Sequence, residues 1–262
     1  MELVDICFNF AHESFRADEH AVLKRAVEAG VTRLICTGSD LEDSERSVAL
    51  AEHMPEHLYA TVGVHPHRAV TWDDATADTL HRLATEHPKV RAVGEAGLDF
   101  NRDYSPRPAQ ERAFEAQLEL AAALHLPAFL HEREAHEHFI AILRRHRAQL
   151  GNAVVHCFTG TEEELLAYLD LDLHIGITGW ICDERRGHHL KDFIHRIPPN
   201  RLMIETDAPY LLPRDIHPKP RSRRNEPAYL PHILQVIAEA VGRPAADVAR
   251  ETTANAIAFY GI

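Results

Sequence analysis

Short apolar runs alternate with longer amphipathic stretches along the chain, and this pattern predicts eight strands with helices between them. The predicted strands are residues 3–8, 33–36, 58–64, 90–93, 127–130, 153–155, 173–177 and 202–204. Between them, apolar residues recur three or four positions apart, as in a helix with one buried face. The predicted helices are residues 21–29, 43–53, 73–86, 108–124, 134–146, a segment that begins at 161, 190–197, 229–240 and 246–260.

Strands that alternate with helices are expected to run parallel, because each helix carries the chain back to the edge where the next strand begins. Eight such units in 262 residues predict a closed (β/α)8 TIM barrel of the α/β class, with residues 1–262 forming a single domain. An open doubly wound sheet is the alternative. The G-x-G-x-x-G turn that is typical of that fold does not follow the first strand.

Composition indicates an ordinary soluble protein, with 45% hydrophobic and 26% charged residues. No apolar run approaches the length of a membrane span, and the first residues lack a secretory signal pattern. The four cysteines form no C-x-x-C pair, which favours reduced thiols in a cytoplasmic protein.

The formal net charge of −12 argues against a protein that coats nucleic acid non-specifically, since such binding needs many Lys and Arg contacts. It leaves open an enzyme that takes one strand end into a pocket, where metal ions offset the local negative charge.

Two carboxylates, Glu205 and Asp207, follow the last apolar run, and Pro209 and Pro213 prevent a helix from starting at once. Residues two apart on a strand share one face, so both carboxylates are expected to point the same way unless the strand has already ended. An acid at the tip of an apolar strand is costly to bury without a partner. Other strand ends supply candidate partners, which are His65, Glu95, His131 and His156.

The C-terminal ends of barrel strands meet at one face, where the active sites of this fold are built. Imidazole and carboxylate groups together are the ligand set of borderline divalent metals such as zinc or manganese. Taken alone, each strand-end His or acid is more often a polar cap on the core. Several of them on one predicted face favour a metal site for hydrolysis, with coordination positions left open for the reaction.

Arg133, two residues after His131, is placed either to clamp a phosphate or to pair with Glu134 or Glu137. The irregular stretch 209–227 is expected to be a functional loop over the barrel mouth. Its basic residues could steer phosphate toward the mouth or form an ordinary solvated loop; they are Lys219, Arg221, Arg223 and Arg224.

Three residues near the ends of the sixth and seventh strands have simpler interpretations. Cys157 follows His156 and is expected to point away from it, into the core. Phe158 and Trp180 could stack a nucleic-acid base, but packing in the core is the more common role of such residues.

The segments around these residues make the sequence resemble the TatD family of metal-dependent deoxyribonucleases. The matching segments cover nearly the whole chain in the family's order, and they are GVHPH (63–67), GEAGLDFNRD (94–103), FLHERE (129–134), VVHCFTG (154–160), GITGW (176–180), IETDAPYLLPRD (204–215), RNEP (224–227) and TTANAIAFYGI (252–262). The run CDERRG (182–187) is similar to the branch that gives the family its name, and not to its paralogues.

The resemblance implies a TIM barrel of the amidohydrolase type that hydrolyses phosphodiester bonds with a divalent metal. The metal ligands that it implies are Glu95, His131, His156 and Asp207. Glu95, which can bridge two ions, and Asp207 are the expected catalytic residues. His65 and Arg133 are expected to bind the substrate beside the scissile phosphate.

For this branch the resemblance implies 3′–5′ exonuclease action on the 3′ ends of single-stranded DNA, with a role in DNA repair. RNA is the further substrate that this branch leaves open. Mg²⁺ is the expected ion in the cell, with Mn²⁺ or Zn²⁺ as alternatives at the site of Glu95, His131 and His156. A monomer is expected. The alternatives are a metal-dependent amide or ester hydrolase, such as an aminoacyl-tRNA deacylase, and a metal-bound scaffold without activity.

The first strand departs from the family pattern. Most members carry D-x-H-x-H there, and its two His residues hold one metal. Here Cys7 and Asn9 stand at those places. One site keeps Glu95, His131 and His156, whereas the other keeps only the oxygen ligands of Glu95 and Asp207. The hypothesis is that this second site binds Mg²⁺ weakly and fills mainly when substrate phosphate is present.

Overall fold

The computed structural model describes residues 2–262, and its eight strands form one parallel sheet in sequence order, as the alternating pattern predicted. The strands are β1 (Leu3–Phe8), β2 (Val31–Cys36), β3 (Leu58–Val62), β4 (Val90–Asp99), β5 (Ala128–Arg133), β6 (Ala153–Val155), β7 (His174–Ile177) and β8 (Leu202–Ile204). Just past the end of β8, Ala208 pairs with Phe8 of β1 and brings the two edges of the sheet together. The predicted (β/α)8 barrel is confirmed.

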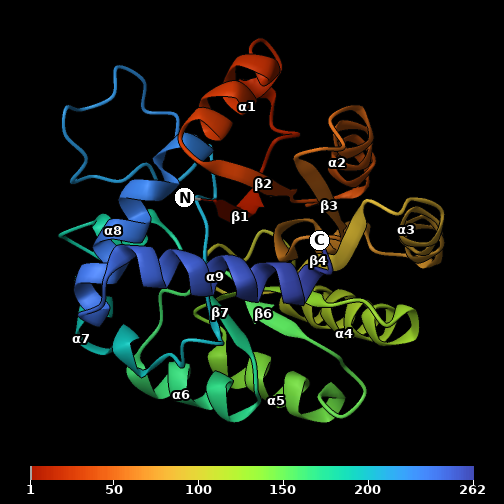
Figure 1. Cartoon of the computed structure of the whole chain (residues 1–262). Helices are drawn as coiled ribbons and strands as arrows, with labels where there is room; N and C mark the ends of the chain where they lie inside the picture. Colours follow the sequence, from red (N-terminus) through yellow and green to blue (C-terminus); the bar gives the residue numbers. More distant parts are fainter. Residues whose placement is uncertain (1) are drawn as a thin grey trace.

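Helices surround the barrel (Figure 1). They are α1 (Glu19–Glu28), α2 (Leu41–His53), α3 (Asp74–Glu86), α4 (Arg107–Leu124), α5 (His136–His146), α6 (Glu162–Asp170), α7 (Leu190–Phe193), α8 (Leu230–Val241) and α9 (Ala245–Tyr260). The predicted helix 190–197 is instead the short α7 followed by a 3-10 turn, η4 (Ile194–Arg196). At the start of α6, Thr161 and Glu164 form the capping box that their spacing predicts.

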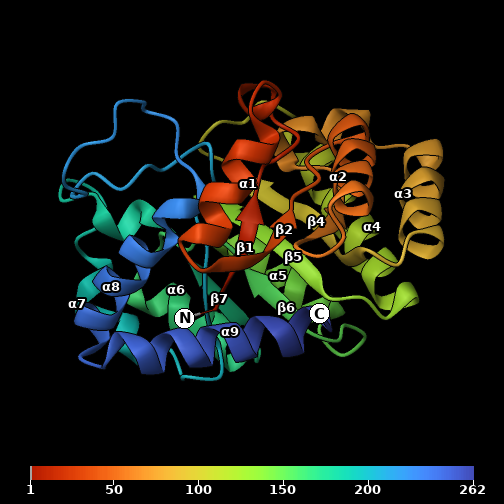
Figure 2. The ribbon, with the colours of Figure 1, turned by 45° about the horizontal axis from the view of Figure 1, so that its top comes forward.

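The N-terminal end of the barrel is closed by α9, which crosses it in Figures 1 and 2. Phe259 and Tyr260 of this helix belong to the same buried cluster as the inward-facing residues of the strands, among them Ile6, Phe129 and Met203. The closed end leaves the C-terminal ends of the strands as the open mouth. Within residues 2–262, no helix is long and apolar enough to cross a membrane.

Strand β4 is longer than its apolar run predicted, because two glycines let it lie very close to β5. A Cβ atom at Gly97 would lie 1.8 Å from the backbone oxygen of His131, and one at Gly94 would lie 2.1 Å from that of Phe129. Both glycines have positive φ angles, of 141° and 152° for Gly94 and Gly97, which other residues rarely adopt. The close approach carries Glu95 into the middle of the mouth.

Buried His174, at the start of β7, gives a test of the packing at the closed end. Its ring lies 5.1 Å from the ring of Phe259, and burial lowers its pKa to about 4. The unfolded chain takes up this proton near pH 6.5, whereas the folded chain resists it down to pH 4. Stability is therefore lost as the pH falls through this range, by about 3 kcal/mol from this group. Urea unfolding between pH 7 and pH 4 should show a shallower acid loss for His174→Gln, and equal slopes in both proteins would contradict the assignment.

Candidate metal centre at the barrel mouth

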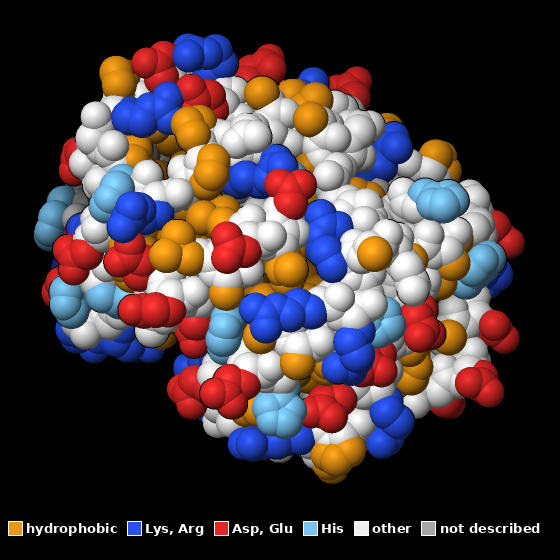
Figure 3. Space-filling model, turned by 90° about the horizontal axis from the view of Figure 1, so that it is seen from below, with side chains coloured by type: hydrophobic (Ala, Val, Ile, Leu, Met, Phe, Trp, Pro, Cys, Tyr) orange, Lys and Arg blue, Asp and Glu red, His pale blue; other side chains and the backbone are white. Residues whose placement is uncertain are grey.

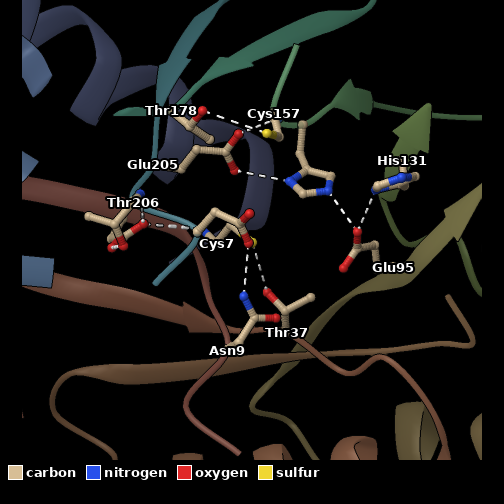
Figure 4. A network of polar contacts seen from close by, with 12 residues as sticks. Cys7, Asn9, Thr37, Glu95, His131, Cys157, Thr178, Glu205 and Thr206 are labelled. Carbon is tan, nitrogen blue, oxygen red and sulfur yellow. Dashed lines mark hydrogen bonds and ion pairs between the residues drawn. The ribbon is translucent and has the colours of Figure 1, made fainter. Parts of the chain in front are cut away.

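The side chains predicted at the strand ends lie together in one open cavity of about 790 Å³. The predicted site residues that line it are His65, Glu95, His131, Arg133, His156 and Asp207. They come from five strands of the barrel. Glu95 lies within β4, His131 and Arg133 lie in the second half of β5, and the other three follow the ends of β3, β6 and β8. The barrel itself therefore brings them together. Figure 4 shows the part of this network around Glu95 and His131.

Glu95 is the centre of the cluster. Its Oε1 atom lies 2.8 Å from His131 Nδ1, 2.8 Å from His156 Nε2 and 3.3 Å from His65 Nε2. Burial raises the pKa of this carboxyl group, but the three imidazoles outweigh that effect and hold the pKa well below its usual range. Glu95 is therefore an ionised carboxylate at neutral pH.

The three imidazoles differ in charge. Burial lowers the pKa of His65 to about 4, so this ring is neutral at pH 7. Burial also opposes charge on His131 and His156, but the neighbouring carboxylates outweigh it and raise both pKa values. A divalent cation placed between these groups would take over the positive charge of the protons.

Outer carboxylates face two of the rings. Glu205 Oε2 lies 3.4 Å from His156 Nδ1, and Asp99 Oδ2 lies 3.7 Å from His131 Nε2. Asp99 also accepts a hydrogen bond from His67 Nε2 at 2.7 Å. A carboxylate on the far side of an imidazole is a usual support of a metal ligand.

The residues present fit a divalent metal. The ligand atoms of His65, Glu95 and His131 lie within 4.8 Å of one another, and His156 meets the same carboxylate oxygen as His131. Mixed imidazole and carboxylate donors suit zinc or manganese better than they suit magnesium, which prefers oxygen ligands alone.

Asp207 reaches the cavity from the segment that closes the barrel. Its backbone N–H donates to Cys7 O at 3.0 Å, and its φ of 55° turns the side chain into the mouth. Asn9 Nδ2 donates to its Oδ1 at 2.8 Å, and the Cys7 thiol lies 3.5 Å from the same oxygen. The two residues that replace the usual first-strand histidines therefore hold Asp207. Burial raises the pKa of Asp207 to about 6.

The expectation that Glu205 and Asp207 point the same way is wrong. The strand ends at Ile204, so the alternation of faces stops there. Glu205 is fully buried beneath the mouth, where it accepts a hydrogen bond from the Cys157 backbone N–H and faces His156. Gly176 makes room for it, because a Cβ atom there would lie 2.7 Å from Glu205 Oε1.

Cys157 also differs from its prediction, since it lines the cavity and does not point into the core. Its φ of 47° breaks the strand geometry on which that prediction depended. Phe158 is buried and packs near Tyr168, as the packing interpretation expects. Trp180 lines the cavity, with the Arg186 guanidinium 4.2 Å from the centre of its ring.

Arg133 lines the cavity, and within residues 2–262 it belongs to no ion pair. Of its two alternatives, pairing with Glu134 or Glu137 is therefore not the one that the structure adopts. The basic run 219–224 does not line the cavity, and its loop extends away from the barrel in Figure 1. Arg224 pairs with Asp18 at 2.7 Å, outside the mouth. The loop reaches the cavity only at its start, through Tyr210 and Leu211.

Some cavity residues were not singled out from the sequence. His67 and Asp99 lie inside the matching segments, and the second His of GVHPH was the available signal. Tyr104 and Tyr210 line the cavity while remaining 66% and 52% exposed, which makes them unusual for large side chains. Neither falls in a periodic pattern, so only the structure reveals them.

A parallel eight-stranded barrel with imidazoles and carboxylates gathered at its C-terminal mouth defines a hydrolase barrel of the metal-dependent class. The TatD related DNase family matches residues 4–261, and the chain belongs to this family, as the motifs predicted.

Relatives match over almost the full length. The 3′-5′ ssDNA/RNA exonuclease TatD of Pantoea ananatis is 51% identical over 260 residues, which cover 99% of this chain and 100% of the relative. The protein with the same name from Escherichia fergusonii is 50% identical over 260 residues and 99% of each chain. Among solved structures, the TatD homologue YJJV of Escherichia coli K12 superposes with a TM-score of 0.89 at 31% identity, covering 99% of this chain and 98% of that one.

The arrangement around His156 predicts that Glu205 strengthens metal binding without touching the ion. Glu205→Gln keeps the shape but removes the charge that faces His156 Nδ1, so the affinity for the tightest Mn²⁺ ion should fall roughly 10- to 100-fold. Calorimetric titration with Mn²⁺ measures this affinity.

In the wild-type protein, the second ion at the mouth should bind far more weakly than the first. Two ions that bind the mouth equally tightly without nucleic acid would contradict the weak second site.

Glu226→Gln is the matched control. Glu226 is a half-buried carboxylate that pairs with Arg25 at 2.7 Å and with Arg224 at 2.9 Å, and it does not line the mouth cavity. Its substitution should leave Mn²⁺ affinity unchanged. Equal losses in both variants would mean that Glu205 acts only through general stability.

Proposed function

We propose that this protein is a metal-dependent 3′–5′ exonuclease that removes nucleotides from single-stranded DNA and RNA. Membership of the TatD related DNase family and the activity named for relatives at 50% and 51% identity support this assignment. The observation that carries it is the cluster of His131 and His156 on one oxygen of Glu95, open to a cavity that also holds Arg133.

Glu95, His131 and His156 are the proposed ligands of the tighter ion, with Glu95 and Asp207 as the oxygen ligands of a weaker one. When bound, a divalent ion polarises the phosphodiester and lowers the pKa of water. We propose Mg²⁺ as the ion in the cell, because it retains several waters and binds through substrate phosphate at sites rich in oxygen ligands. Mn²⁺ or Zn²⁺ suits the tighter position.

Asp207 is the proposed general base. Its Oδ1 accepts the hydrogen bond from Asn9, which fixes the carboxylate and leaves Oδ2 to accept a proton from the attacking water. A pKa of about 6 keeps the group mostly ionised at neutral pH yet basic enough to take that proton.

Arg133 and His65 are the proposed phosphate contacts. The guanidinium of Arg133 offers two parallel N–H donors to the non-bridging oxygens and offsets the charge that develops there. His65 is neutral at pH 7, so it contributes a donated hydrogen bond and no net charge.

The rim of the cavity suits unpaired bases. Tyr104, Tyr210 and Trp180 line it, and an aromatic ring stacks any base whose face is free. A base inside a duplex is already stacked on its neighbours, which favours single strands. On the face seen in Figure 3, basic side chains are interspersed with acidic ones and form no broad basic surface. Together with the formal net charge of −12, this supports binding that depends on the cavity more than on a charged exterior.

Four further expectations stay predictions. They are the monomeric state, the cytoplasmic location, a role in DNA repair, and the assignment of residues 1–262 to one domain.

The first test is His156→Ala, assayed on a 5′-labelled single-stranded oligonucleotide after chelation and restoration with Mg²⁺, Mn²⁺, Zn²⁺ or Co²⁺. Activity should fall at least about 100-fold, because loss of a ligand exceeds the effect of losing an outer support. A cooperative melting transition should remain. His138→Ala is the control, since His138 is exposed on α5, bonds Glu111 and lies outside the cavity.

Retained activity in His156→Ala would remove this residue from the site. Shortening of the oligonucleotide from its 5′ end, or activity that chelation does not affect, would contradict the proposed reaction. Release of amino acids from charged tRNA without nucleotide release would replace it with amide or ester hydrolysis.

A second test addresses base stacking at the rim. Tyr104→Ala should raise the KM for single-stranded DNA roughly 5- to 100-fold, the range expected for one lost stacking contact. The kcat should change little, because the ring of Tyr104 meets that of His67, at 4.8 Å, and His67 is not a proposed ligand. Tyr104→Phe keeps the ring and should behave like the wild-type protein. A loss in kcat alone, or equal losses in both variants, would argue against stacking.

A further inference from the structure

A second group of side chains with atoms that can bind a metal lies outside the mouth cavity. Cys182 ends the 3-10 turn η3 (Gly179–Cys182), Asp215 lies in the long segment after β8, and His232 lies in the first turn of α8. One ligand atom from each of the three lies within 4.8 Å of the other two. None of the three lines the cavity at the mouth.

We propose that Cys182, Asp215 and His232 bind a zinc-like divalent cation that serves a structural role. A thiolate, an imidazole and a carboxylate together are a zinc ligand set, whereas magnesium and calcium take oxygen ligands. Three protein ligands leave the fourth tetrahedral position to water. This donor set differs from the one at the mouth, where imidazoles and carboxylates surround Glu95.

Burial and access suit such an ion. Cys182 is only 2% exposed, so its sulfur forms the inner wall of the group. The side chains of His232 and Asp215 are 29% and 39% exposed, which leaves an entry from solvent. His232 Nε2 and Asp215 Oδ1 are 2.7 Å apart, and tetrahedral zinc separates such ligands by roughly 3.3 Å, so a small side-chain adjustment admits the ion.

Two of the three ligands come from segments that line the mouth cavity, which are η3 and the segment after β8 with Tyr210 and Leu211. Trp180 of η3 lines that cavity, two residues before Cys182. The segment that carries Asp215 already docks against the turn after η3, because Arg214 pairs with Glu184 at 3.1 Å and lies 3.6 Å from Asp183. An ion would add a third attachment, to α8, and hold these segments in place.

The competing explanation is a plain hydrogen-bonded group in which His232 and Cys182 both donate to Asp215. Cobalt distinguishes the two, because Co²⁺ replaces zinc and a cobalt–thiolate bond gives an intense near-ultraviolet charge-transfer band. Nitrogen and oxygen ligands alone do not produce this band. The probe is therefore Co²⁺, added to the full-length protein after a chelator has removed its metal ions, and then displaced by Zn²⁺.

The wild-type protein should develop the thiolate band, with an intensity that corresponds to one Co²⁺ ion bound at this site. Addition of Zn²⁺ should abolish the band. Cys182→Ser should lose the band, and its Zn²⁺ affinity at this site should fall at least about 100-fold. His232→Asn should weaken Zn²⁺ binding without removing the thiol. Cys7→Ser and Cys157→Ser should keep the band, which assigns it to Cys182 and not to a thiol at the mouth.

A wild-type protein without the band would overturn the proposal, as would a band that persists in Cys182→Ser or disappears in Cys7→Ser. Far-ultraviolet circular dichroism of each variant checks that it is folded, and His232→Asn supplies an independent test if Cys182→Ser is not. Zn²⁺ should also raise the melting temperature of the wild-type protein more than that of either variant, since an ion that binds only the folded state stabilises it.

Discussion

The mouth of this barrel depends on one buried carboxylate, Glu95, and the imidazoles that face it. A carboxylate in so little water is stable only with partners of opposite charge or strong hydrogen-bond donors. His131 and His156 supply them at 2.8 Å from one oxygen. The arrangement requires β4 to press against β5, which Gly94 and Gly97 permit, because any Cβ atom at these positions would collide with the neighbouring backbone.

The need to balance charge around Glu95 also explains the outer carboxylates of the cluster. Glu205 and Asp99 lie behind the rings of His156 and His131, so each imidazole has a carboxylate on both sides. The result is a concentration of negative charge that favours a cation between these groups. An acidic protein can thereby act on a phosphate backbone, since the proposed ions, together with Arg133, counter the charge of the substrate only where the reaction takes place.

The fold followed from the sequence more completely than the site did. Alternation of strands and helices needs only local periodicity, so the number and order of the strands were predictable. The lengths of β4 and β5 were not, because polar residues such as Glu132 extend these strands beyond their apolar runs. Glu205 and Cys157 were misplaced for one reason. Both follow the last regular residue of a strand, and the alternation of faces no longer holds there.

The sequence by itself determined the class of barrel and the family, because apolar periodicity and motif spacing are local properties of the chain. It also identified the residues at the strand ends, including the replacement of first-strand histidines by Cys7 and Asn9. Only the tertiary structure decided which of these groups meet. Asn9 holds Asp207, Glu205 supports His156, and Cys182 approaches His232 across about 50 residues of chain. Such contacts depend on how distant segments pack, which no local pattern records.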